Sequence, residues 1–412
     1  PGGEYSPMQL QLKDIDDAKP QASNFFYLSG YGGKQSLILL ICGDSTRVDS
    51  EQIIFSLMPT AFTDLWAGTL PSPKQLASDM KFDQGLPLDK VGEFLKEQLQ
   101  GIKHIYYPIG ESGELDSYIC GLVNELSTKG SRQGAVTPTE LIDSNEIFAA
   151  MRLVKSPDEL AMIRQAASIS VGGHKRLAEM LPNLEYEYQG EAELAYHYKS
   201  HNATTAFPSI VAGGINGCTL HYTKNDMPIT PSDSLLVDSG ASLHHYAADM
   251  TRCYPPRAGD ATAKEAYIEV YQEVLAVHKR LCATVKPGMT LAQLHAKAVE
   301  WLVESLVKLE ILRGSSSNLI SDLIVEGSYK KYYPHQTSHW IGLDVHDLGL
   351  YKEQQLGEGM VFSIEPGLYF APDDDSVASR WRGIGVRIED TIAITDKGVE
   401  NLTQDMPYWQ NK

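Results

Sequence analysis

The stretch Pro334-His-Gln-Thr-Ser-His-Trp-Ile-Gly-Leu-Asp-Val-His-Asp347 contains three of the twelve histidines of the chain within fourteen residues. They are His335, His339 and His346. Two acids lie among them, Asp344 and Asp347. Imidazole is the commonest protein metal ligand and the usual general acid or base near neutral pH. Gln336 stands where the zinc motif His-Glu-x-x-His has its glutamate, so that motif is absent. The stretch is either a functional site or a hydrogen-bonded loop. Other residues of the C-terminal half distinguish these two interpretations.

Four further acids lie in segments with the pattern of β-strands. They are Asp238, Asp249, Glu365 and Glu389. The segment 235–240 reads as a strand that ends in a turn, and 247–253 can return as its partner. If this hairpin is centred between residues 243 and 244, the first two acids stand directly opposite each other, about 5 Å apart at Cβ. The segments around the other two acids alternate in the same way, with Arg387 and Glu389 on one face of their strand.

Each acid alone is explained by a strand with one face in solvent. A converging set is different, because two carboxylates repel by roughly 4 kcal/mol at 4 Å and an effective dielectric near 20. A bound cation relieves that repulsion. The strand pattern leaves open whether the four acids converge.

The size and charge of the chain narrow the classes of protein. Its 412 residues exceed the roughly 250–300 at which a single core stops growing, so two domains are expected. A hydrophobic content of 42% and a charged content of 21% are typical of a soluble globular protein. The formal net charge of −18 disfavours binding to nucleic acid or to an anionic membrane surface, since both would repel it.

The five cysteines are widely spaced and form no Cys-x-x-Cys pair. That pattern is typical of reduced thiols rather than of a disulfide framework or a thiolate zinc site. No apolar run approaches the roughly 18 residues that a membrane span needs, and no signal-peptide pattern is visible. We therefore expect a cytoplasmic protein without membrane association.

The pattern of expected secondary structure changes near residue 150. Before it, short apolar runs alternate with helical patterns, which favours a small α/β domain over residues 1–150. After it, Ser156, Pro157 and Glu159 form a strong helix start, with an N-cap, a first-turn proline and a capping box. Helices are expected at 189–200, 261–285 and 290–311, and strands at 208–213, 233–239, 246–253, 360–370 and 384–395. Long helices separated from antiparallel strand pairs predict an α+β fold over 151–412.

These residues carry a resemblance to a known family. The two aspartates, the Ser338-His-Trp-x-Gly-Leu-Asp-Val-His-Asp run, Glu365-Pro-Gly and Arg387-Ile-Glu-Asp resemble the metallopeptidases with the pita-bread fold. That family includes aminopeptidase P, prolidase, methionine aminopeptidase and the metal-free creatinase. The runs around His221, Tyr369 and Arg387 are most similar to aminopeptidase P, the Xaa-Pro aminopeptidase. The resemblance implies a pita-bread domain preceded by a smaller non-catalytic α/β domain.

The resemblance also implies a site with two divalent metal ions, with manganese the expected metal. Its ligands would be Asp238, Asp249, His339, Glu365 and Glu389. In the family pattern Asp238 binds one ion, Asp249 and Glu389 bridge both, and His339 and Glu365 complete the second. Four carboxylates and one imidazole are a hard, oxygen-rich set that favours such metals.

The implied reaction is hydrolysis of the bond between an N-terminal residue and a following proline in a peptide substrate. A hydroxide that bridges the two metal ions would attack the scissile carbonyl, and Glu365 would carry the proton. His346 is expected to stabilise the oxyanion and His221 to contact the substrate. Supporting positions around the ligands are expected for Arg387, Tyr369 and His335, with the Arg387 guanidinium able to hold a ligand carboxylate bidentately. The two acids Asp344 and Asp347 are expected to hold their loop. Family members commonly form homo-oligomers, so a dimer or tetramer is expected.

Two alternatives remain beside this interpretation. A prolidase would share the site and cleave only dipeptides. A non-catalytic pita-bread binding scaffold would have lost metal ligands, whereas all five ligand types are present in this chain.

Overall fold

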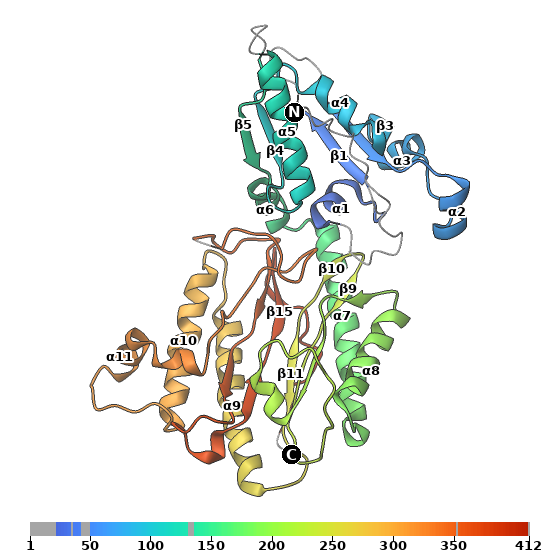
Figure 1. Ribbon diagram of the computed structural model, residues 1–412. Helices are drawn as coiled ribbons and strands as arrows, with labels where there is room; N and C mark the ends of the chain where they lie inside the picture. The colour runs from blue at the N-terminus through green and yellow to red at the C-terminus, as the bar shows by residue number, and fades with distance from the viewer. Residues whose placement is uncertain (1–21, 34–35, 43–49, 131–135, 352, 411–412) are drawn as a thin grey trace, which may run out of the picture. The chain divides into compact units, whose positions relative to one another are not determined.

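The computed structural model describes residues 22–33, 36–42, 50–130, 136–351 and 353–410. The chain divides into two compact units, Pro1–Phe148 and Ala149–Lys412. The boundary expected at residue 150 lies two residues from this division. Both units mix helices and strands (Figure 1), and the α+β prediction is confirmed.

The described residues of the first unit form two small sheets. Strands β1, β2 and β3 form one, in which β1 and β2 are antiparallel and β2 and β3 are parallel, and the parallel pair β4 and β5 forms the other. Its core is built from apolar residues of β2, α4 and α5, such as Phe55, Leu95 and Leu122. The elements are α1 (Ser23–Ser29), β1 (Ser36–Ile41), β2 (Glu51–Ser56), α2 (Ala61–Ala67), α3 (Pro73–Met80), β3 (Gln84–Pro87), α4 (Val91–Gln98), β4 (His104–Tyr107), α5 (Gly113–Gly130) and β5 (Glu140–Asp143). Helix α6 (Asn145–Leu153) crosses the division between the two units.

The second unit packs long helices on two sides of short antiparallel sheets, as Figure 1 shows. Its helices are α7 (Pro157–Met180), α8 (Glu187–Ser200), α9 (Ala261–Thr284), α10 (Leu291–Lys308) and α11 (Leu319–Glu326). Its strands are β6 (Thr204–Thr205), β7 (Ile210–Gly213), β8 (Leu235–Asp238), β9 (Ala241–Leu243), β10 (Tyr246–Ala247), β11 (Thr251–Tyr254), β12 (Val361–Ile364), β13 (Gly367–Phe370), β14 (Ile384–Arg387), β15 (Asp390–Thr395) and β16 (Gly398–Asn401).

The sheets of the second unit divide between the helix pairs. Helices α7 and α8 share a core with β7, β8 and β9, whereas α9 and α10 share one with β12, β13, β14 and β15. The strand orders are β11-β8-β7, β10-β9-β6, β12-β15-β16 and β13-β14.

Helix α7 begins as the sequence predicts. The Ser156 hydroxyl accepts from the backbone N–H of Glu159 at 3.3 Å, and the Glu159 carboxylate accepts from the N–H of Ser156 at 2.8 Å. This reciprocal capping box satisfies two N–H groups that the first helical turn leaves without partners.

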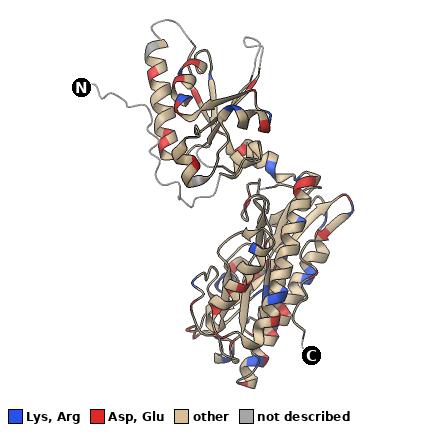
Figure 2. Cartoon of the chain, turned by 90° about the vertical axis from the view of Figure 1, so that its right-hand side faces the viewer, with Lys and Arg blue, Asp and Glu red and all other residues tan. Residues whose placement is uncertain are grey.

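Charged residues are interspersed in sign along the helices (Figure 2). Among the described helices, none combines the length and the apolar character needed to cross a bilayer.

A buried ion pair ties β11 to β15. The Arg252 guanidinium donates to Asp390 Oδ1 at 2.7 Å, and both side chains are at most 2% exposed. Asp390 also accepts from the hydroxyls of Thr403 at 2.7 Å and Tyr408 at 2.6 Å. Burial by itself would raise the pKa of Asp390, but Arg252 and these donors hold it well below its usual range.

We predict that Asp390→Asn destabilises the second unit by about 3 kcal/mol at pH 7, because it leaves the Arg252 charge buried without its partner. A depressed carboxyl pKa stabilises the fold above the pKa of the unfolded chain, and that contribution is lost as the pH falls through the folded value. The difference between variant and wild type should therefore shrink below about pH 4. Urea unfolding across this pH range measures it, with the exposed Asp396→Asn as the matched control. An equal effect of both substitutions would contradict the prediction.

Candidate metal centre

Five side chains from separate segments meet at one point of the second unit. Asp238 ends β8, Asp249 lies between β10 and β11, Glu365 follows β12, Glu389 lies between β14 and β15, and His339 precedes β12. His339 Nε2 is 3.4 Å from Asp249 Oδ2 and 3.5 Å from Glu365 Oε1. It is 3.8 Å from Glu389 Oε1, and Asp238 lies close enough to Asp249 for its charge to act on that carboxyl group. The convergence that the sequence left open is present in the structure.

The predicted register of the first two acids is wrong. Asp238 pairs with Thr251, not with Asp249. The turn residues His244 and His245 both have positive φ, at 49° and 69°. Two positive φ values are the conformation of a two-residue type I′ hairpin turn, so the hairpin is centred between these histidines, one residue later than expected. Asp249 reaches the site from the irregular segment between β10 and β11.

The two long strands expected at 360–370 and 384–395 are each interrupted at an acid. Glu365 separates β12 from β13, and Glu389 separates β14 from β15. Because β12 pairs with β15 and β13 with β14, the hairpin changes sheets at this level. Arg387 and Glu389 therefore do not share one face of a continuous strand. The backbone of Glu389 instead exchanges hydrogen bonds with Thr251 of β11, at 3.2 and 3.4 Å.

The tautomer of His339 suits a metal ligand. Its Nδ1 lies 3.1 Å from the carbonyl oxygen of Trp340 and donates to it, so Nε2 is the lone-pair nitrogen that faces the carboxylates. The backbone N–H of His339 donates to Ser363 Oγ at 3.0 Å, and this hydroxyl donates to Glu365 Oε1 at 3.2 Å. These bonds orient the ring and the carboxylate without using Nε2.

Arg387 is the buried cation beside the acids. Its Nη2 donates to Asp238 Oδ2 at 2.6 Å, and its Nη1 donates to the Tyr369 hydroxyl at 2.9 Å. The contact with Asp238 uses one N–H, so it is not the bidentate arrangement that the sequence suggested. Burial raises the pKa of Tyr369, and its protonated hydroxyl lies 2.9 Å from His335 Nε2. Burial, reinforced by Arg387, lowers the pKa of His335 to about 4, so this imidazole is neutral near pH 7.

The carboxyl groups have the properties of metal ligands. Burial raises the pKa of Asp249, Glu365 and Glu389, and neighbouring carboxylates raise those of Asp249 and Glu389 further. Within the described part of the chain, one oxygen each of Asp238, Asp249 and Glu389 is buried without a hydrogen-bond partner. Buried carboxylate oxygens without donors are unfavourable, and hard divalent cations are the partners they prefer. The donor set therefore fits divalent metal ions.

Two predicted histidines flank this centre. The His346 and His339 rings are 4.5 Å apart at an angle of 77°. Burial, then the nearby His339 and His221, lower the pKa of His346. His221 is exposed in the segment that follows β7, and it makes no hydrogen bond with the described residues. Both imidazoles are therefore placed beside the ligands rather than among them.

The two acids of the histidine stretch bind protein cations. Arg152 donates to Asp344 at 2.7 Å and also to Asp347, and Lys155 Nζ donates to Asp347 at 3.0 Å. The side chains of Arg152, Lys155 and Asp347 are at most 3% exposed. This buried cluster holds the loop that carries His339 and His346.

Two hydroxyls that the sequence analysis did not single out complete the support. Thr251 Oγ1 donates to Glu389 Oε2 at 2.7 Å, and Thr391 Oγ1 donates to the carbonyl oxygen of Asp249 at 2.7 Å. Each threonine lies two residues after one of these acids and bonds to the other. The sequence shows this arrangement as the patterns Asp-x-Thr and Glu-x-Thr. The supporting role of the threonines becomes evident only from the contact between the two segments.

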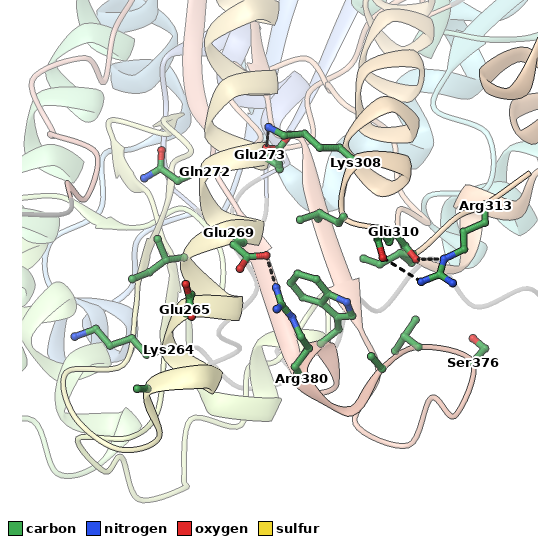
Figure 3. Close-up of a pocket in the computed structure, with 17 residues that line it drawn as sticks. Lys264, Glu265, Glu269, Gln272, Glu273, Lys308, Glu310, Arg313, Ser376 and Arg380 are labelled. Atoms are coloured by element: carbon green, nitrogen blue, oxygen red, sulfur yellow. Dashed lines mark hydrogen bonds and ion pairs between the residues drawn. The ribbon is translucent and has the colours of Figure 1, made fainter.

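A groove of about 1220 Å³ lies elsewhere on the second unit, between α9, the end of α10 and the segment 376–381. Figure 3 shows Arg380 directed at Glu269 and Lys308 directed at Glu273, two ion pairs on the walls of this groove. It contains none of the predicted site residues, so it is separate from the metal centre.

Two protein-family models match this chain, and both agree with a metallopeptidase site in the second unit. The model of metallopeptidase family M24 matches residues 161–396, and that of the aminopeptidase P N-terminal domain matches residues 9–106. This chain belongs to metallopeptidase family M24. The family recognised from the ligand motifs is confirmed, and the protein is a metallopeptidase with the fold of aminopeptidase P.

Three relatives illustrate the likeness. The Xaa-Pro aminopeptidase of Escherichia coli (strain K12) is 34% identical over 402 residues, which cover 97% of this chain and 89% of the relative. The structure of proline aminopeptidase P II from Yersinia pestis has a TM-score of 0.87 at 34% identity, over 96% of this chain and 90% of that one. Aminopeptidase P from E. coli with the inhibitor Pro-Leu has a TM-score of 0.87 at 33% identity, over 96% and 89% of the two chains.

We predict that Asp249→Ala loses bound metal and activity together, since Asp249 is one of three residues whose ligand atoms all lie within 4.8 Å of one another. Elemental analysis of protein dialysed against manganese measures the metal, and peptide hydrolysis measures the activity. The exposed Asp373→Ala is the control and should retain both. Full metal content in Asp249→Ala would remove this residue from the ligand set.

Proposed function

We propose that this metallopeptidase is an Xaa-Pro aminopeptidase, which releases the N-terminal residue from peptides whose second residue is proline. The observation that carries the metal-dependent hydrolysis is the convergence of the five ligand side chains at one site. The relatives named above support the substrate class, since one is an Xaa-Pro aminopeptidase and another binds a proline-containing dipeptide as inhibitor.

The proposed cofactor is a pair of divalent ions, with manganese the expected metal. Asp238 would hold one ion, and Asp249 and Glu389 would contact both. His339 and Glu365 would complete the second. When bound by these residues, divalent ions would supply an activated water and would polarise the scissile carbonyl group. An oxygen-rich set with a single imidazole favours manganese, magnesium or iron over thiol-binding metals.

The side chains around the ligands have distinct proposed roles. Glu365 takes a proton from the attacking water and returns it to the proline nitrogen as the peptide C–N bond breaks. Ser363 Oγ donates to Glu365 Oε1 at 3.2 Å and so orients this carboxylate for the proton transfer. His346 donates to the oxyanion that develops on the carbonyl oxygen, and His221 contacts the substrate around the scissile bond.

The supporting residues hold the ligands for this chemistry. Arg387 offsets the charge of Asp238 and fixes the Tyr369 hydroxyl, which in turn contacts His335. A neutral His335 beside Glu365, with Nδ1 3.6 Å from Glu365 Oε2, adds no positive charge that would keep that carboxyl group ionised.

The proposal also includes a homo-oligomer, a dimer or tetramer, in a reducing compartment such as the cytoplasm. Helix α2 supports the oligomer because Phe62, Leu65 and Trp66 are 58%, 81% and 68% exposed on its surface. A cluster of this kind is a frequent mark of a protein interface. All five cysteines are free thiols, which suits a reducing compartment.

The function is tested with a matched pair of peptides, Arg-Pro-Pro and Gly-Pro, and manganese-loaded protein. We expect release of arginine from the tripeptide and slow or no cleavage of the dipeptide. Mass spectrometry of the products gives the answer. Rapid cleavage of the dipeptide alone would assign a prolidase instead. No cleavage of either peptide with metal bound would favour a binding scaffold.

We predict that His346→Ala lowers the turnover number roughly a hundredfold or more, as lost oxyanion donors do, with metal content unchanged. Steady-state kinetics with the tripeptide and elemental analysis measure the two quantities. The exposed His104→Ala, in the first unit, should behave as wild type. A normal turnover number for His346→Ala would exclude the oxyanion role.

We predict that light scattering after size exclusion shows a dimer or tetramer, and that Leu65→Lys shifts it towards monomer by placing a charge on the α2 surface. Val325→Lys, at an equally exposed apolar position on α11, is the control and should leave the oligomer intact. A monomeric wild-type protein would rule out this part of the proposal.

A further inference from the structure

Glu187 is a fully buried carboxylate without a cation beside it. It is the first residue of α8, it is 0% exposed, and it forms no ion pair with any Lys, Arg or His that the structure describes. A buried charge of this kind is unfavourable unless hydrogen bonds replace its water shell. Its position at a helix N-terminus also favours negative charge.

Four donors surround this carboxylate, and all four come from one segment. Glu187 Oε1 accepts from the backbone N–H of Gly213 at 2.7 Å and from the Asn216 amide at 2.8 Å. Glu187 Oε2 accepts from the Tyr222 hydroxyl at 2.7 Å and from the backbone N–H of Met227 at 3.0 Å. Burial, followed by this bond, raises the pKa of Tyr222, so its hydroxyl remains a donor. The segment 213–227 is thus gathered around one side chain, and His221 lies inside it.

A second residue of α8 holds the same segment. Asn225 Nδ2 donates to Glu191 Oε2 at 3.0 Å, while Asn225 Oδ1 accepts from the backbone N–H of Val211 at 2.9 Å. Glu191 is one helical turn after Glu187, so the two carboxylates lie on one face of α8. This face is therefore a polar docking strip for the segment.

The opposite side of the segment contacts β14, beside the candidate metal centre. Arg387 Nη2 donates to the carbonyl oxygen of Leu220 at 3.5 Å, and a Cβ at Gly385 would lie 2.0 Å from the carbonyl oxygen of Gly217. Leu220 and Tyr222, the two neighbours of His221, are thus held from different sides, the first by its carbonyl and the second by its hydroxyl. The imidazole between them is exposed.

We infer that Glu187 is a positioning residue for His221, and that it acts by fixing the segment 213–227 against α8 through four hydrogen bonds. The inference rests on the proposed function, in which His221 contacts the substrate. Among the described residues, the Glu187 carboxylate hydrogen-bonds to this segment alone, so it acts through the segment that it holds. Glutamine at this position would present an N–H₂ group where Met227 and Tyr222 now donate, and the clamp would lose one side.

The test is a double-mutant cycle of Glu187→Gln and His221→Ala in the full-length, manganese-loaded protein. We expect Glu187→Gln to lower kcat/KM for Arg-Pro-Pro about tenfold with unchanged metal content, as changes in residues that orient a site do. In the His221→Ala background the same substitution should cost less than about twofold, because coupled residues are not additive. Equal losses in both backgrounds, or no loss in either, would overturn the inference.

Matched variants separate positioning from general damage. Glu193→Gln removes another carboxylate of α8, one that pairs with Arg176 and not with the segment, and should leave kcat/KM unchanged. Tyr222→Phe removes one of the four donors without changing the charge, and should give a smaller loss with the same coupling to His221. A loss from Glu193→Gln as large as that from Glu187→Gln would also overturn the inference.

Hydrogen exchange tests the clamp independently of the reaction. Amides in 213–227 should exchange at least about tenfold faster in Glu187→Gln, while α9 and α10 remain protected. Unchanged exchange in this segment would overturn the clamp even if the enzyme is active. Faster exchange in a protein that cleaves neither peptide would retain the clamp and reject the proposed function, so the two failures are distinguishable.

Discussion

The second unit is built around the cost of placing like charges together. Asp249, Glu365 and Glu389 lie around one imidazole, and two ionised carboxylates repel by roughly 4 kcal/mol at 4 Å and an effective dielectric near 20. The raised pKa values of all three acids express this cost. Arg387 offsets only part of it, through its bond to Asp238. The remaining charge favours a bound divalent cation at this site.

The course of the backbone directs acidic side chains from different strands towards one site. Side chains on a continuous strand alternate between its faces and cannot turn towards a common centre. Here the strands break at Glu365 and Glu389, and the hairpin passes from one sheet to another. Hydroxyls two residues from an acid then stabilise the breaks. Ser363 bonds to Glu365, and Thr251 and Thr391 connect the segments of Glu389 and Asp249.

The two loops beside the centre, which carry His346 and His221, are anchored in the same way. Each presents an exposed imidazole and is anchored by buried charged groups next to it. His346 precedes Asp347, which lies between Arg152 and Lys155. His221 precedes Tyr222, which bonds to Glu187. In both cases the anchor is a carboxylate that accepts several hydrogen bonds. The donors to Asp347 are cationic, and the donors to Glu187 are neutral. Loops of this kind keep a functional side chain accessible while fixing its backbone.

The sequence by itself determined the local features and the chemistry of this protein. The capping box of α7, the α+β class, the ligand types and the family all depend on nearby residues or on motifs, and these are readable without a fold. The centring of the hairpin at His244 and His245, the strand breaks at Glu365 and Glu389, and the single-bond contact of Arg387 with Asp238 were decided by the tertiary structure. So were the roles of Thr251, Thr391 and Glu187, whose contacts join residues 26 to 142 positions apart in the sequence. A turn that needs two positive φ values and a carboxylate that collects distant donors are stabilised by packing, and no local pattern encodes them.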